Sequence, residues 1–96
     1  MSKITNFTIS KMYCCNCGKE GLPICRKKSH SREDGHLKKL YCVYCGKLWN
    51  HVEVKPYSNY TYEDFRYEME HHNFDKEGNR IKPLKVLRKE INYENY

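Results

Sequence analysis

Four of the six cysteines lie in two copies of one short pattern, C-x-x-C-G-K. The first copy begins at Cys14 and Cys17, and the second at Cys42 and Cys45. Two cysteines at this spacing can place both sulfurs on one metal ion, and the glycine that follows adopts positive φ at little cost, which lets backbone amides turn toward the thiolates. Four thiolates are a ligand set of structural zinc. The sequence therefore predicts one structural Zn²⁺ bound by these four cysteines.

Two other uses of the cysteines fit the sequence less well. Three disulfides would suit a secreted chain, but residues 1–7 lack the apolar run of a signal peptide, and a disulfide framework does not require the repeated Gly-Lys. Iron in a rubredoxin-like site uses similar knuckles, but those proteins tend to be acidic, whereas this chain has a formal net charge of +6. No stretch has the apolar length of a membrane span. We therefore expect a soluble protein in a reducing cytoplasm.

The remaining cysteines are not needed for the metal. We expect Cys25 to be a small buried hydrophobic residue and Cys15 to be a spare thiol beside the site. A metal-dependent nuclease is an alternative that would use His36 or His51 to activate water and Glu53 to bind a second metal. Because a closed four-cysteine site leaves no position for water, we predict that the protein is not an enzyme.

The elements that position the cysteines are expected to be short strands. Alternating apolar residues predict strands over 4–9, 37–41 and 48–54, with 21–26 as a short edge strand limited by Pro23. A three-stranded antiparallel sheet with the ion between hairpin turns is the simplest arrangement. In the last strand, Trp49, His51 and Glu53 share one face, which we expect to be exposed to solvent.

One or two helices are expected to follow the strands. Thr61 is a plausible N-cap, and Tyr62, Phe65 and Met69 recur at helical spacing on one face. After Pro83, the residues Leu84, Leu87 and Ile91 share a helical face, although this segment could equally be a flexible tail. We predict a small metal-stabilised α+β domain, with a ribbon over residues 1–57 and a helical extension over 58–96 packed on it as one compact unit.

Residues 14–47 resemble a zinc ribbon, a superfamily in which two C-x-x-C knuckles on β-hairpins bind one structural zinc. A strand rather than a helix follows Cys45, which favours a ribbon over a treble clef. The resemblance implies Cys14, Cys17, Cys42 and Cys45 as ligands, while Cys15 replaces a proline frequent in the family. In size and general character the chain is also similar to small zinc-ribbon proteins of bacteriophages and prophages. Zinc ribbons serve as docking modules, often on RNA polymerase, ribosomes or DNA.

Charge is distributed unevenly along the chain. Residues 19–39 contain seven basic and three acidic residues, whereas residues 59–79 contain six acidic and two basic residues. Basic side chains can neutralise phosphates, and Tyr44 and Trp49 could stack on bases, although charge runs often serve only solubility. The candidate residues for binding nucleic acid or a partner are Arg26, Lys27, Lys28, Arg32, Lys38, Lys39, Lys47 and Trp49. A second, acidic face is predicted from Glu63, Asp64, Glu68 and Glu70.

These observations predict a non-enzymatic zinc-ribbon binding module. It would engage nucleic acid or a host nucleic-acid-processing complex, such as RNA polymerase or a defence nuclease of the CRISPR or restriction type, and regulate or inhibit it. Two alternatives stay open, which are a direct DNA- or RNA-binding regulator without a protein partner and a small metal-dependent nuclease. A membrane or a small-molecule substrate is not expected as a partner.

Overall fold

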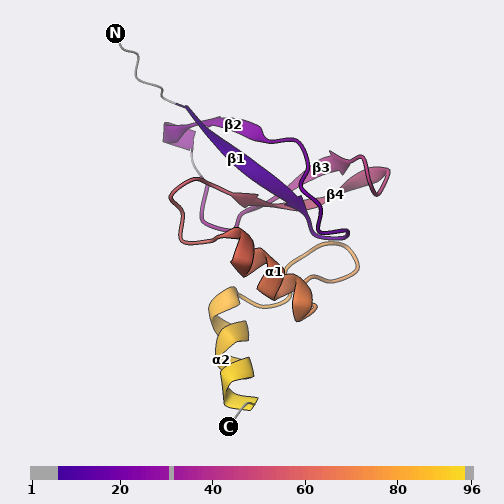
Figure 1. Cartoon of the computed structure of the whole chain (residues 1–96), viewed down its shortest axis with the longest axis vertical. Helices are drawn as coiled ribbons and strands as arrows, with labels where there is room; N and C mark the ends of the chain where they lie inside the picture. The colour runs from indigo at the N-terminus through magenta and orange to yellow at the C-terminus, as the bar shows by residue number, and fades with distance from the viewer. Residues whose placement is uncertain (1–6, 31, 95–96) are drawn as a thin grey trace.

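A four-stranded antiparallel sheet carries both knuckles in the computed structural model, which describes residues 7–30 and 32–94 (Figure 1). The strand order is β2-β1-β4-β3. The strands are β1 (Phe7–Cys14), β2 (Ile24–Lys27), β3 (Leu37–Cys42) and β4 (Lys47–Val54). The predicted small α+β class is confirmed, with one more strand than the three expected. Residues 4–6 of the first predicted strand lie outside the described part.

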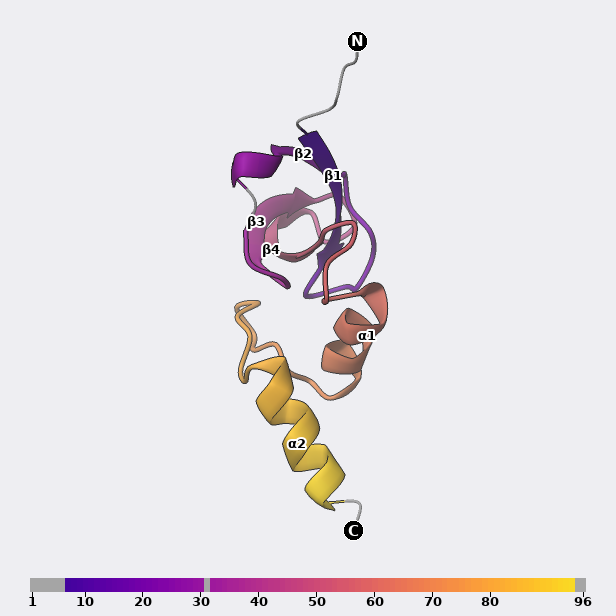
Figure 2. The ribbon, with the colours of Figure 1, turned by 90° about the vertical axis from the view of Figure 1, so that its left-hand side faces the viewer.

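The fourth strand joins the sheet because β1 divides its length between two neighbours. Its first half, Phe7–Ser10, pairs with β2, and its second half, Lys11–Cys14, pairs with β4. The short edge strand expected over 21–26 is thus β2, two residues shorter. This change of partner curls the sheet, which Figure 2 shows from the side.

Curling buries residues on both faces of β4. Val52 is buried on the face toward the helices, and His51 and Glu53 are buried on the other face. The expectation that His51 and Glu53 face solvent is therefore wrong. The physical reason is that the chain after the first knuckle folds over this face, where Gly21 donates its N–H to the Met12 carbonyl at 2.7 Å.

Two helices follow the sheet, as predicted. Helix α1 (Tyr62–Glu70) lies beside the sheet, and α2 (Leu84–Glu94) extends away from it (Figure 1). Thr61 is the N-cap of α1 in a capping box, because its hydroxyl accepts from the Asp64 N–H and the Asp64 carboxylate accepts from the Thr61 N–H. A short 3₁₀ helix, η1 (Lys28–His30), directly follows β2. The Ile91 side chain is outside the described part.

The core between the sheet and α1 is largely aromatic. Tyr13 of β1 stacks on Phe65 of α1 with ring centroids 5.5 Å apart, and the Phe74 ring centroid lies 6.1 Å from that of Phe65. Val52 and Tyr60 complete this small cluster with Cys15. A core of this size contributes limited stability, so a metal ion that joins β1 to the β3–β4 hairpin would add a substantial share.

A buried ionic network ties α1 to the loop that precedes α2. The Glu68 carboxylate has no exposed surface and receives hydrogen bonds from Arg80 Nε at 2.7 Å and Arg80 Nη2 at 3.0 Å. Asn73 Nδ2 donates to it at 2.6 Å and the Tyr60 hydroxyl donates as well. Arg80 Nη1 also donates to the Gly35 carbonyl at 3.0 Å. The network therefore connects three segments that are far apart in the sequence.

The predicted acidic face of α1 is consequently divided. Glu63 and Glu70 are exposed, but Asp64 and Glu68 are buried. Asp64 pairs with Arg88 of α2, and Glu68 pairs with Arg80. These two acids hold the C-terminal segment on α1, so they are not available to a partner.

Candidate metal centre and its surroundings

The four cysteines predicted as ligands come together at one end of the sheet. Cys14 and Cys42 end β1 and β3, and Cys17 and Cys45 follow in the turns. The sulfur atoms of all four lie within 4.8 Å of one another, with Cys14–Cys45 at 3.8 Å and Cys17–Cys42 at 3.7 Å. A tetrahedron with metal–sulfur bonds of about 2.3 Å places its sulfurs about 3.8 Å apart, whereas a disulfide needs about 2.05 Å. The geometry fits a single tetrahedral metal ion.

The two knuckles repeat the same backbone hydrogen bonds. Gly18 N–H donates to the Cys14 carbonyl and Gly46 N–H to the Cys42 carbonyl, both at 2.8 Å. Both glycines have positive φ, +77° and +72°, which explains why the sequence repeats glycine at this position. The Cys45 N–H is directed at the Cys42 sulfur at 3.4 Å.

One side chain that sequence reasoning missed connects the knuckles. The Asn16 Nδ2 group of the first knuckle donates to the Cys45 sulfur of the second at 3.2 Å, and the Asn16 N–H is directed at the Cys14 sulfur at 3.4 Å. Donors to thiolates disperse their negative charge. The position of Asn16 between Cys14 and Cys17 was the available signal in the sequence. Spacing alone, however, does not show that its side chain reaches the other knuckle.

The ligand thiols differ in acidity. Burial raises the pKa of Cys14 to about 12, and burial also raises the pKa of Cys17. Burial acts in the same direction on Cys42, but N–H groups of Cys45 and Tyr44 outweigh it and lower the pKa of Cys42 to about 7. Since metals bind thiolates, uptake of an ion near neutral pH must release protons from this site.

The two other cysteines occupy different environments. Cys15 is buried in the aromatic core, and this burial raises its pKa, so the thiol is inert. Cys25 is exposed on β2, where it pairs with the exposed Ile9 of β1, so the expectation of a buried Cys25 is wrong. Its strand is at the sheet edge, where nothing in the described chain covers its side chain. The four-cysteine group is the one metal-ligand cluster in the described residues.

The basic residues predicted as a binding surface are not brought together. Arg26 forms a salt bridge of 2.8 Å with the buried Glu53, so it is structural. Lys27 lies opposite Phe7 where β2 pairs with β1. Phe7 is seven residues from Cys14, a distance of about 23 Å along β1. Lys38 is half-buried opposite His51, whereas Lys39, Lys47 and Trp49 lie near the second knuckle.

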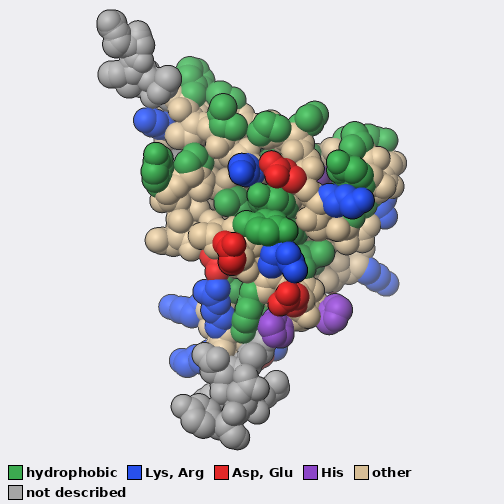
Figure 3. All heavy atoms as spheres, in the orientation of Figure 1, with side chains coloured by type: hydrophobic (Ala, Val, Ile, Leu, Met, Phe, Trp, Pro, Cys, Tyr) green, Lys and Arg blue, Asp and Glu red, His purple; other side chains and the backbone are tan. Residues whose placement is uncertain are grey.

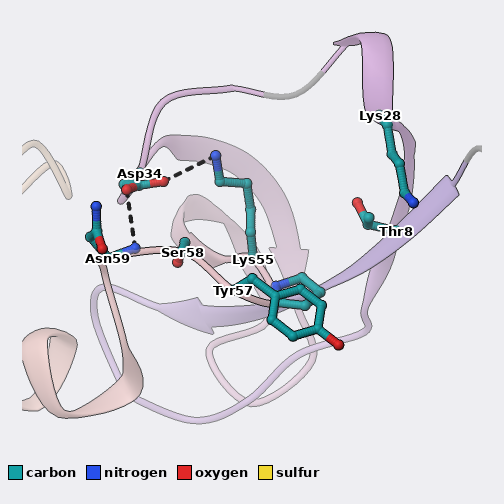
Figure 4. Close-up of a pocket in the computed structure, with 8 residues that line it drawn as sticks. Thr8, Lys28, Asp34, Lys55, Tyr57, Ser58 and Asn59 are labelled. Atoms are coloured by element: carbon teal, nitrogen blue, oxygen red, sulfur yellow. Dashed lines mark hydrogen bonds and ion pairs between the residues drawn. The ribbon is translucent and has the colours of Figure 1, made fainter.

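Lys28 belongs to a polar hollow at the β1–β2 end, separate from the metal centre (Figure 4). The hollow has a volume of about 280 Å³ and is also lined by Lys55 and Tyr57. Lys55 pairs with Asp34 at 3.1 Å and donates to the carbonyl of the exposed Arg32. The positive charge that Lys28 and Lys55 bring to this hollow is therefore partly neutralised by Asp34.

The end of the sheet that bears the second knuckle exposes apolar and aromatic side chains beside lysines. Tyr41, Tyr44 and Leu48 are 60%, 59% and 61% exposed. Lys19 Nζ lies 4.6 Å from the Tyr44 ring centroid. Figure 3 shows hydrophobic and basic side chains adjacent over this hairpin. We call Lys19, Tyr41, Tyr44, Lys47 and Leu48 the knuckle face.

Trp49 differs from its predicted role as an exposed platform. It is half-buried, Lys47 Nζ lies 4.2 Å over its ring, and it packs against the aromatic core. Its Nε1 atom is buried without a hydrogen-bond partner in the described residues. The exposed rings next to the four-cysteine cluster are therefore tyrosines.

The residues of the nuclease alternative have other partners. His51 is buried and its Nδ1 lies 2.8 Å from the Trp49 carbonyl oxygen. His36 Nδ1 lies 3.6 Å from a Glu33 carboxylate oxygen. The Glu53 carboxylate accepts from Ser10 Oγ at 2.7 Å and from Arg26. Burial opposes ionisation of Glu53, but Arg26 and Ser10 outweigh it and lower its pKa.

No family model matches this chain, and no curated protein or solved structure matches it either. The four-cysteine cluster on a small antiparallel sheet is consistent with a zinc-ribbon-like site. Neither helix in the described residues is long and apolar enough to cross a membrane.

Proposed function

We propose that the protein is a non-enzymatic binding module in which one Zn²⁺ orders the β3–β4 hairpin so that the knuckle face binds nucleic acid. The observation that carries the proposal is the grouping of lysines and exposed tyrosine rings at this end of the sheet. Lys19 lies over the Tyr44 ring, Tyr41 lies opposite Leu48, and Lys47 precedes Leu48 in β4. Aromatic rings stack on bases, and lysines neutralise phosphates and release counterions.

Zinc is the ion that best suits the site. Cys14, Cys17, Cys42 and Cys45 would hold it, and it would supply structural cross-linking and no reaction chemistry, because four thiolates close its coordination. Metal analysis of the purified chain tests this assignment. One zinc per chain is expected, whereas one iron would favour an electron carrier.

Nucleic-acid binding is tested by fluorescence anisotropy of labelled DNA and RNA at several salt concentrations. Affinity is expected to fall steeply with salt. In Lys19→Ala and Lys47→Ala, the slope of log K against log salt concentration should become shallower by about 0.7 to 0.9 for each lost phosphate contact. Tyr44→Ala is expected to weaken binding by about fivefold or more, as loss of one stacked base does. Lys85→Ala on α2 is the matched control, since Lys85 is exposed and remote from the knuckle face. Absence of salt-dependent binding would refute the proposal.

A nucleic-acid-processing protein complex is the second candidate partner. Exposed Val43 and Leu48 favour it, because adjacent exposed apolar side chains often mark protein contacts. Capture from a bacterial cytoplasmic lysate, with and without nuclease treatment, separates the two candidates. A partner that resists nuclease and is lost with Val43→Asp favours a docked regulator or inhibitor, whereas recovery of nucleic acid alone favours direct binding.

A further inference from the structure

A groove lies between β4 and the turn that precedes α2. It has a volume of about 460 Å³, larger than the hollow of Figure 4, and it adjoins the knuckle face through Leu48. Leu48 and Trp49 line it from β4, Lys39 from β3, and Lys76 and Glu77 from the turn. None of the four cysteines lines this groove, and two of its lining residues, Lys39 and Trp49, are among the predicted binding residues.

The turn that forms one wall is fixed by its own hydrogen bonds. Asp75 Oδ1 accepts from the N–H groups of Glu77 and Asn79, both at 2.9 Å. The turn is then attached to the sheet, because Asn50 Nδ2 donates to the Gly78 carbonyl at 2.9 Å. Gly78 has φ +84°, and a Cβ there would lie 2.8 Å from Trp49 Nε1. The groove is therefore preformed, with close contact between the turn and the tryptophan.

The chemistry of the lining suits a nucleotide. The exposed Leu48 side chain offers apolar surface to a flat ring, and the half-buried Trp49 lies beside it in the lining. Lys39 lines the groove from β3 and Lys76 from the turn, with Glu77 as the acidic group. With Lys47 beside the groove, the local charge is positive and complements phosphate.

We propose that this groove binds one unpaired nucleotide of single-stranded nucleic acid, with its base against Leu48 and its phosphates near Lys39 and Lys76. This inference rests on the proposed function and specifies its substrate class. Unpaired bases present the ring faces that apolar and aromatic surfaces contact, whereas paired bases in a duplex do not. The protein would therefore prefer single strands to duplexes.

The test compares anisotropy for labelled oligothymidylate and oligouridylate of about 20 nucleotides with a duplex of equal length and with an abasic strand. Zinc-loaded Lys76→Ala is the principal variant, since Lys76 is exposed and outside the knuckle face. Its affinity for single strands is expected to fall about fivefold, and the slope of log K against log salt concentration should become shallower by about 0.7. Leu48→Ala is expected to weaken binding to base-containing strands more than to the abasic strand. Lys85→Ala is the matched control.

Each outcome separates the two proposals. If the wild-type protein binds single strands and duplexes equally, or if Lys76→Ala behaves like Lys85→Ala, the groove assignment is refuted while nucleic-acid binding stands. If the wild-type protein binds none of the probes, both fail. A loss in Lys76→Ala confined to single strands supports the groove, and a thymidylate-to-uridylate comparison then assigns DNA or RNA.

Discussion

Replacing Arg80 with methionine is expected to destabilise the zinc-loaded protein by about 3 kcal/mol. The change removes two hydrogen bonds to Glu68 and one to the Gly35 carbonyl, and leaves a carboxylate with no exposed surface without its cation. Breaking a buried ion pair on one side typically costs about 3 to 5 kcal/mol. We take the lower value because Tyr60 and Asn73 still donate to Glu68. Of a total stability of about 5 to 15 kcal/mol, this is a large part.

The assay is urea unfolding followed by far-UV circular dichroism, with zinc at one fixed excess because bound metal adds to apparent stability. Arg66→Met is the matched control. Its ion pair with Glu70 also lies on α1, at 3.6 Å, but the two side chains are 56% and 63% exposed. An exposed pair of this kind contributes up to about 0.5 kcal/mol.

A double variant decides whether the unpaired charge is the cause. Glu68→Gln combined with Arg80→Met removes the charge. The amide oxygen can still accept from Asn73, and the Tyr60 hydroxyl can turn to accept from the amide NH2, so the double variant is expected to be more stable than Arg80→Met alone. The reasoning is refuted if Arg80→Met costs less than about 1 kcal/mol, or if the double variant loses the sum of both single losses.

Three further predictions concern the metal centre and the start of α1. Cys42→Ser is expected to abolish metal binding and unfold the sheet, whereas Cys25→Ser should keep both; native mass spectrometry and circular dichroism test this, and a folded, metal-loaded Cys42→Ser protein would contradict it. Because the pKa of Cys14 and of Cys17 is raised, metal uptake displaces at least two protons, so affinity should fall about a hundredfold or more from pH 7 to pH 6 in a chelator competition; an affinity independent of pH would contradict the assigned ligands. Thr61→Ala should cost about 1 kcal/mol in urea unfolding, with Thr61→Ser close to wild type, and equal losses would show that the cap hydroxyl is not the cause.

Local signals in the sequence predicted much of the structure. The two C-x-x-C-G-K segments predicted the sulfur cluster and its positive-φ glycines, and Thr61 predicted the start of α1. These features depend on residues a few positions apart, whose geometry the local backbone fixes. The strands around the second knuckle were predicted within a residue at each end for the same reason.

Features that depend on distant partners were not predictable in this way. Glu68 and Asp64 read as exposed helix acids, because nothing local shows that Arg80 and Arg88 neutralise them. Glu53 read as a surface residue because its partner, Arg26, lies on a strand that joins the sheet only through β1. Burial of a charge is a tertiary property, and one sequence does not reveal it.

The close contact between Gly78 and Trp49 has a spectroscopic consequence. The chain has one tryptophan. The Lys47 ammonium lies over its ring, and Gly78 of the turn that precedes α2 lies close to its Nε1 atom. The same residue is on the β3–β4 hairpin, which bound zinc is proposed to order, so its environment is expected to respond to metal binding and to a ligand in the groove. Intrinsic emission from Trp49 is thus a built-in optical signal, shifted to longer wavelength when water reaches the indole. A chelator titration and a titration with an oligonucleotide can be followed on the unlabelled protein, with Gly78→Ala reporting how much of the signal comes from the turn.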